Sequence, residues 1–394
     1  MKNYRFAKRM AGVGPSATLQ MGRRAKELAQ QGADVIDLSV GEPDFATPGF
    51  ITKAAKQAID AGLTSFYTPT LGLDELRRAI ANNHQTIDPL SRKNVGVATG
   101  AKLVLYALMQ ILISDGEKVV IPAPYWVSYS QQVLLCQGNV FAVYPQNPAM
   151  KLTTAELLEL DFMPKAVIIN NPTNPTGALY TKDELQELID WAAVNDVFLI
   201  VDEIYGNLVY NGAKFTSVLE LSGVKDSQLI VVDGVSKTYS MTGWRIGWAI
   251  ADEQIIVKMG EVLDHMTSNP AAVSQYAALA AINSDNTAAK GMREIFESRL
   301  NYSLNALEDI PGLTMAEKPQ GAFYCFLRVD PAILARKKLT CTNELVLDLL
   351  DKKHVALAAG EGFDLPGYVR LSYAKDEKIL QAAFARIKEY LTND

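Results

Sequence analysis

The chain has 394 residues and a formal net charge of -6, with 48% hydrophobic and 21% charged residues. This balance is typical of a soluble globular protein, and the length suffices for two structural units around a large core. The charge lacks the basic excess of a nucleic-acid-binding protein, and no apolar run is long enough to span a bilayer. We therefore expect neither a nucleic-acid partner nor a membrane segment.

The N-terminal residues and the cysteines indicate the cellular compartment of the protein. Residues 1–6 lack the apolar stretch of a signal peptide. The three cysteines, Cys136, Cys325 and Cys341, are widely spaced and form no CxxC motif, so we interpret them as reduced thiols. These features predict a cytoplasmic protein, and no metal site is expected.

Short apolar runs rich in β-branched residues recur along the middle of the chain, at 119–121, 166–169, 198–201 and 229–232. They do not alternate with polar residues, which is typical of strands buried on both faces of a parallel sheet. Helical patterns cover 103–113 and 181–194, and the second opens with a capping box. Strands alternating with helices predict an α/β fold, in which ligands bind at the carboxyl ends of the parallel strands.

The last hundred residues have a different pattern. A long helical pattern covers 292–307, and strand-like runs lie at 322–327 and 368–373. These elements predict a smaller α+β domain.

Two motifs near strand ends could contact a ligand. Gly100, Ala101 and Lys102 precede an expected helix, whose free backbone N–H groups could bind phosphate while the small residues let it approach. Many helices start after a glycine, so this motif is weak by itself. Trp126 follows an apolar run and could stack on a planar ring, or it could be a core aromatic.

Polar residues follow the next two apolar runs. The segment 170–177 contains two Asn-Pro steps, which could form only a turn or could fix Asn174 against a cofactor, with a cis bond before Pro175. Asp202 could hold a pyridine nitrogen protonated or cap a helix. Tyr205 lies three residues on and could donate to a phenolic oxygen of the same ring.

Lys237 is the most informative residue, because it lies in a loop of small residues after the run 229–232. A lone lysine is usually a solvated surface charge. Burial, however, would lower its pKa and make its amine a nucleophile toward carbonyls. Arg245 lies eight residues on and could clamp a phosphate. A lysine that forms a Schiff base beside a phosphate-binding arginine is what pyridoxal phosphate requires.

Arg370 lies within a largely apolar strand pattern. Burying an arginine without a partner is costly. The residue therefore predicts either a bound substrate carboxylate or an internal salt bridge.

Taken together, these residues resemble the class I and II aminotransferases of pyridoxal-phosphate fold type I, over nearly the whole chain. The matching segments are 15–18, 41–45, 67–69, 236–247 and the strand with Arg370. The chain is most similar to bacterial aspartate aminotransferases, including aspartate/prephenate enzymes. The resemblance implies a large cofactor domain over 46–290, with a mostly parallel seven-stranded sheet, and a smaller α+β domain formed by 1–45 and 291–394.

The resemblance also implies residue roles. Lys237 would carry the cofactor and shuttle a proton, with Asp202 and Tyr205 as the other catalytic residues. The implied cofactor contacts are Gly100, Ala101, Lys102, Trp126, Asn174, Ser236, Arg245 and, across a subunit boundary, Tyr67. The implied substrate contacts are Gly41, Trp126, Asn174, Arg370, Lys102, Ser16 and Thr18. A contribution of Tyr67 to the neighbouring subunit implies a homodimer with shared active sites.

Two positions depart from the family pattern. Gly234 stands where some aspartate aminotransferases have a phosphate-binding serine, and Asp264 stands where animal-type enzymes have an arginine for the distal carboxylate. In the bacterial subgroup a lysine matching Lys102 takes this role, helped by the segment 16–18. Lys102 is thus the candidate for dicarboxylate recognition, unless it is a solvated lysine at a helix start, where a cation is unfavourable.

The predicted reaction is a ping-pong transfer of the amino group of L-aspartate, or a related amino acid, to 2-oxoglutarate. Aromatic amino acids, alanine, prephenate and kynurenine remain open as substrates. A carbon–sulfur β-lyase would use the same cofactor residues. A non-catalytic regulator or structural protein fits less well, because Lys237, Asp202 and Arg370 are all present and no DNA-binding segment is appended.

Overall fold

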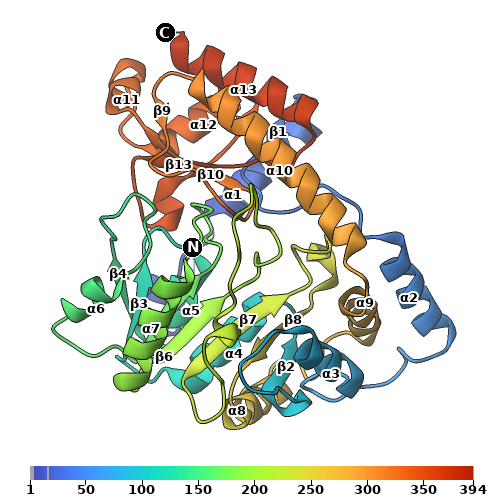
Figure 1. The fold of residues 1–394 in the computed structure, drawn as a ribbon. Coiled ribbons are helices and arrows are strands. Elements are labelled where there is room, and N and C mark those ends of the chain that lie inside the picture. The colour runs from blue at the N-terminus through green and yellow to red at the C-terminus, as the bar shows by residue number, and fades with distance from the viewer. Residues whose placement is uncertain (1–3, 16, 394) are drawn as a thin grey trace.

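A seven-stranded sheet forms the centre of the larger part of the molecule in the computed structural model, which describes residues 4–15 and 17–393 (Figure 1). The strand order is β2-β8-β7-β6-β5-β3-β4. The strands are β2 Val95–Ala98, β3 Lys118–Pro122, β4 Asn139–Val143, β5 Ala166–Asn170, β6 Phe198–Asp202, β7 Leu229–Gly234 and β8 Gly247–Ile250. Within this sheet β8 runs antiparallel to both of its neighbours and the other pairings are parallel. The predicted mostly parallel seven-stranded sheet is confirmed.

Helices cover both faces of this sheet, which explains why its strands are apolar on both sides. Val167 and Ile169 of β5 pack in one cluster with residues of α2, α3, α7 and α9, whereas Ile168 packs in another with residues of α4, α5 and α8. The helices are α2 Gly49–Asp60, α3 Asp74–Asn83, α4 Ala101–Leu112, α5 Ser128–Leu135, α6 Thr154–Leu158, α7 Lys182–Val194, α8 Glu253–Asp264 and α9 Ala272–Ile282. The predicted capping box of α7 is present, because Thr181 and Glu184 each bond the backbone N–H of the other.

The smaller part is built on a four-stranded antiparallel sheet of order β12-β13-β10-β9. Its strands are β9 Leu313–Thr314, β10 Tyr324–Val329, β12 Ala358–Ala359 and β13 Tyr368–Ser372, and its helices are α10 Thr287–Glu308, α11 Pro331–Lys337, α12 Thr342–Lys353 and α13 Glu377–Thr392. In Figure 1 the long helices α10 and α13 lie at the top, above the larger sheet.

The N-terminal segment joins this smaller part. Helix α1 (Ala17–Gln30) leads to β1 (Ile36–Asp37), which pairs in parallel with β11 (Val355–Ala356). Helix α10 runs without a break through the predicted boundary at 290. The bounds 46–290 against 1–45 and 291–394 therefore stay a prediction. In the part of the chain that the structure describes, no helix is long and apolar enough to cross a membrane.

Candidate active site

A cavity of about 280 Å³ lies where β5 and β6 end, between the larger and the smaller part. The predicted site residues that line it are Gly41, Ala101, Lys102, Trp126, Asn174, Asp202, Tyr205, Ser236, Lys237, Arg245 and Arg370. They come from segments that are far apart in the chain. Among the described residues, no group of three or more histidine, cysteine or acidic side chains is placed to hold a metal ion.

Two of the predicted residues that the structure describes, Gly100 and Tyr67, do not line the cavity. Gly100 lies against Arg245, because a Cβ atom at this position would collide with the guanidinium. Tyr67 is 93% exposed. Ser16 and the side chain of Thr18 lie outside the described part of the structure.

Lys237 reaches the cavity from the loop after β7, and its Nζ donates a hydrogen bond to the carbonyl oxygen of Gly41 at 2.7 Å. The pKa of Lys237 is lowered to about 8, mainly by burial; the nearby cations Arg370 and Arg245 act in the same direction, and the carboxylates of Glu42 and Asp202 oppose the shift. More of the amine is therefore neutral near neutral pH than in an ordinary lysine, and the neutral amine is the form that attacks carbonyls.

Asp202 is buried at the end of β6, where it accepts hydrogen bonds from Tyr129 Oη at 2.7 Å and from the N–H of Ile204 at 3.1 Å. Burial raises the pKa of Asp202 to about 6, although both hydrogen bonds and the charge of Lys237 oppose the shift. A buried carboxylate of this kind gains from a cationic partner. The arrangement therefore suits a protonated ring nitrogen.

Arg370 is buried, and its hydrogen-bond partners among the described residues are neutral. Its Nη1 donates to Asn174 Oδ1 at 2.9 Å and its Nη2 to the carbonyl oxygen of Ser39 at 2.5 Å. Its Nε has no partner among the described residues. A buried guanidinium held by neutral groups retains a demand for an anion. The geometry thus favours a bound carboxylate over the internal salt bridge that the sequence left open.

Lys102 lines the cavity at the start of α4, and its Nζ lies 4.9 Å from the centre of the Trp126 ring. Burial and the charge of Arg245 lower the pKa of Lys102. Part of the residue is nevertheless exposed to solvent in this single chain. Its ammonium is therefore available to a ligand while being held beside an aromatic face.

The start of α4 and Arg245 form an anion cradle. Among the described residues no side chain caps the N-terminus of α4 at Gly100, whose φ is 83°, so no side chain occupies the N–H groups of Ala101 and Lys102. Gly247 lets the chain pass closely, because a Cβ there would collide with the backbone N of Ala101. Arg245 Nη1 donates to the carbonyl of Thr242 at 3.0 Å, which orients the guanidinium. This donor set fits a phosphate group, and with Lys237 and Asp202 it fits pyridoxal phosphate.

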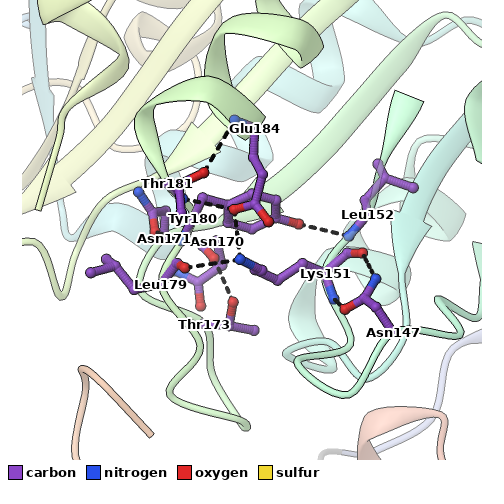
Figure 2. Close-up of polar contacts among 10 residues, drawn as sticks. All are labelled: Asn147, Lys151, Leu152, Asn170, Asn171, Thr173, Leu179, Tyr180, Thr181 and Glu184. Carbon is purple, nitrogen blue, oxygen red and sulfur yellow. Dashed lines mark hydrogen bonds and ion pairs between the residues drawn. The ribbon is translucent and has the colours of Figure 1, made fainter. Parts of the chain in front are cut away.

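A polar network joins residues of the segment 170–184, to which Asn174 belongs, to residues of the segment 147–152 (Figure 2). The N–H of Tyr180 donates to Asn171 Oδ1 at 3.0 Å, and the Tyr180 hydroxyl accepts from the N–H of Leu152 at 2.9 Å. Lys151 Nζ donates to the carbonyl of Leu179 at 3.2 Å and to Glu184 Oε2 at 2.6 Å. The expected cis bond between Asn174 and Pro175 is present.

We expect Lys151→Met to lower the free energy of unfolding by about 1–3 kcal/mol, because Glu184 loses its cation and the Leu179 carbonyl loses its donor. The Lys151 side chain is only 12% exposed. The urea midpoint, followed by circular dichroism, measures the loss. Lys93→Met is the matched control, because its ion pair with Glu253 is on the surface and contributes about 1 kcal/mol or less. Equal losses in the two variants would contradict this account of the network.

Sequence reasoning assigned no role to Tyr129, Tyr324 and Asn170, which also line the cavity. Asn170 Nδ2 donates to the carbonyl of Asp202 at 2.7 Å, and its Oδ1 accepts from the N–H of Asn174 at 2.7 Å. Tyr129 could have been found, because it lies three residues after Trp126; the N–H of Tyr129 donates to the Trp126 carbonyl, and the two ring centres are 5.4 Å apart. Tyr324 carried no such signal, because it is one aromatic among others in an apolar strand.

The proteins that this chain is similar to agree with the pyridoxal phosphate site that the geometry indicates. The model of the family "Aminotransferase class I and II" matches residues 33–387. The chain is 43% identical to aspartate aminotransferase of Geobacillus stearothermophilus and 41% identical to asparagine–oxo-acid transaminase of Streptococcus mutans, each over 98% of this chain and 99% of the relative. The structure of aspartate aminotransferase from Thermotoga maritima has a TM-score of 0.90 at 34% identity, over 98% of this chain and 100% of that one. The aspartate aminotransferase structure from Rhizobium meliloti has a TM-score of 0.91 at 34% identity, over 99% of both chains. These matches confirm the predicted fold type I architecture. The chain belongs to the class I and II aminotransferases, and it is a pyridoxal-phosphate-dependent transaminase.

Proposed function

We propose that the protein transfers the amino group of L-aspartate to 2-oxoglutarate in two ping-pong stages. The observation that carries this proposal is a single cavity lined by a nucleophilic lysine, a buried carboxylate and two cations that are available to carboxylates, Arg370 and Lys102. Several relatives are named aspartate aminotransferase, which supports aspartate as donor. The relatives reported above are named transaminases, so they do not favour a carbon–sulfur β-lyase.

Pyridoxal phosphate, when bound, supplies a ring that withdraws electrons from the substrate Cα. In our proposal Asp202 keeps the proton on the ring nitrogen, and Trp126 stacks on the ring. Tyr205 and Asn174 donate to the phenolic oxygen. Asn174 Oδ1 already accepts from Arg370, so its Nδ2 is the atom that can donate. The phosphate would be held by the backbone N–H groups of Gly100, Ala101 and Lys102, by Ser236 and Arg245, and by Tyr67 of the neighbouring subunit.

We propose that Lys237 Nζ moves the proton at the substrate Cα. Its lowered pKa lets the amine both accept and return a proton near neutral pH. Arg370 and the backbone of Gly41 hold the α-carboxylate, which places Cα within reach of that amine. Lys102, with Ser16 and Thr18, holds the distal carboxylate of aspartate.

Lys102→Ala is expected to raise the KM for L-aspartate by about 10–30-fold, because the distal carboxylate loses its cation. The KM for L-alanine should change by less than about twofold, since alanine has no distal carboxylate. Steady-state kinetics with 2-oxoglutarate as acceptor measure both values. Equal changes for the two donors would remove Lys102 from dicarboxylate recognition.

The proposed function is tested by the visible absorbance of the purified holoenzyme with L-aspartate and no acceptor. We expect loss of the band of the lysine-bound cofactor and formation of oxaloacetate in an amount equal to the enzyme. L-Asparagine and L-alanine are compared in parallel, because one relative is named for asparagine. A band that aspartate leaves unchanged but another amino acid removes would retain the transaminase and discard aspartate as donor.

We also propose a homodimer with shared active sites, a division into domains 46–290 and 1–45 with 291–394, and a cytoplasmic location. Support for the dimer comes from Phe66 and Tyr67, two neighbouring aromatic residues that are 83% and 93% exposed. Exposed aromatic side chains of this size are frequent at protein interfaces. Light scattering of the eluted holoenzyme would measure its mass, and a monomer would contradict shared sites.

A further inference from the structure

Tyr324 lies on β10 in the smaller part of the molecule and contacts two proposed site residues from different parts of the fold. Its hydroxyl oxygen lies 2.9 Å from that of Tyr205, which follows β6. The centre of its ring lies 4.3 Å from Cζ of Arg370 on β13. The pairing of β10 with β13 sets Tyr324 opposite Ser372 and Phe326 opposite Arg370, so Tyr324 and Arg370 are diagonal neighbours on one face of the sheet.

The backbone of Gly41 lies close to the same hydroxyl of Tyr324. A Cβ at position 41 would collide with Tyr324 Oη, so only glycine fits beside this tyrosine without movement. The carbonyl of Gly41 in turn accepts the hydrogen bond from Lys237 Nζ at 2.7 Å. Tyr324 therefore touches the residues proposed for the substrate carboxylate, Arg370 and Gly41, and one proposed for the cofactor oxygen, Tyr205.

The direction of the hydrogen bond between the two tyrosines decides what Tyr205 can do. Both side chains are buried, and burial raises the pKa of each hydroxyl, so both keep their protons at neutral pH. A hydroxyl has one proton to donate and two sites that accept. If Tyr324 donates to Tyr205, the proton of Tyr205 is free for an acceptor in the cavity. Donation in a chain also strengthens the second hydrogen bond.

We propose that Tyr324 is a positioning residue whose hydroxyl donates to Tyr205, directing the Tyr205 proton to the phenolic oxygen of the cofactor, and whose ring supports the guanidinium of Arg370 for the substrate carboxylate. This inference rests on the proposed roles of Tyr205 and Arg370. It assigns two separable effects to one side chain, the hydroxyl acting on the cofactor side and the ring on the substrate side.

Tyr324→Phe tests the hydroxyl, because it removes the donor and keeps the ring. The readout is the pH midpoint at which the visible band of the lysine-bound cofactor titrates in the holoenzyme. A weaker hydrogen bond from Tyr205 stabilises negative charge on the phenolic oxygen less. The proton on the nitrogen that joins Lys237 to the cofactor is then retained to higher pH. We expect the midpoint to rise by about 0.3–1 pH unit, less than in Tyr205→Phe, with a change in KM for aspartate below about twofold.

Tyr324→Leu tests the ring, because it removes the aromatic face below Arg370. We expect the KM values for aspartate and alanine to rise together by about fivefold or more, since both donors carry the α-carboxylate. This common rise differs from the aspartate-specific rise expected of Lys102→Ala. A Leu variant with unchanged KM for both donors would overturn the role of the ring.

The double variant Tyr205→Phe/Tyr324→Phe decides whether the hydroxyl acts through Tyr205. If it does, the double variant has the midpoint of Tyr205→Phe alone, because the second substitution has nothing left to change. Additive shifts would overturn the proposed relay. The proposed function is decided separately, by the response of the wild-type band to L-aspartate, so the two hypotheses fail on different measurements.

Discussion

Lys237→Ala is expected to reduce the turnover of L-aspartate with 2-oxoglutarate by about 10⁴-fold or more, because one amine both holds the cofactor and moves the proton at Cα. Lys102 is the other lysine among the residues that line the cavity, but its Nζ is directed over the Trp126 ring. Lys237 Nζ instead is fixed by the carbonyl of Gly41, beside the group proposed to hold the substrate carboxylate. No lining lysine is thus placed to replace it.

Oxaloacetate formation under saturating substrates measures the loss, and circular dichroism checks that the variant is folded. The matched control is Lys318→Ala, because Lys318 is an exposed lysine whose partner Glu308 is also exposed. The control should keep wild-type turnover. Substantial turnover in Lys237→Ala would overturn the assignment of Lys237 and with it the proposed mechanism.

The sequence could predict the part of the site that is built on the large sheet. Asn174, Asp202 and Lys237 each follow an apolar run rich in β-branched residues, and these runs are β5, β6 and β7. Neighbouring parallel strands end at the same edge, so polar residues after such runs must lie close together. Their convergence in one cavity follows from local pattern and from one rule about parallel sheets.

The substrate side of the site could not be derived in this way. Arg370 and Tyr324 belong to the smaller sheet, and no local pattern says how that sheet meets the larger one. The sequence pattern left a substrate carboxylate and an internal salt bridge open as partners of Arg370, and only the family resemblance favoured the carboxylate. The strand expected at 322–327 begins two residues later, at Tyr324, because Ala322 has a φ of 59°, in the left-handed region that a strand cannot include.

Side-chain pairs that are distant in sequence were also beyond prediction. Lys151 and Glu184 are 33 residues apart, and Tyr129 and Asp202 are 73 residues apart. Hydrophobic periodicity reports which face of an element is buried, but it carries no information on which polar side chains meet across elements. The supporting network behind Asn174 and the partner of Asp202 therefore required the structure.

Asp202→Asn is expected to lower kcat for L-aspartate by about 10²–10³-fold, because the amide keeps the shape of the carboxylate but not the charge that holds the ring nitrogen protonated. An asparagine oxygen can still accept from Tyr129, so the local fold should survive.

The substitution Asp202→Asn also changes how the affinity of the apoenzyme for pyridoxal phosphate depends on pH. Burial raises the pKa of Asp202 to about 6. Below that pH the ionised fraction of Asp202 falls by about tenfold per pH unit, and the cofactor affinity of the wild type should fall with it.

Titrating the apoenzyme with pyridoxal phosphate from about pH 5 to 8 measures this affinity. Ionisation of the cofactor's own phosphate affects the wild type and Asp202→Asn alike, so the difference between them reports on Asp202. Glu203→Gln is the matched control. Glu203 is also buried and burial raises its pKa to about 7, but its carboxylate accepts from Ser217 Oγ and the N–H of Val218, outside the cavity. The control should therefore keep the acid-side loss of affinity that Asp202→Asn lacks. If Asp202→Asn instead retained that loss in full, the titrating group would not be Asp202, and its proposed pairing with the ring nitrogen would have to be abandoned.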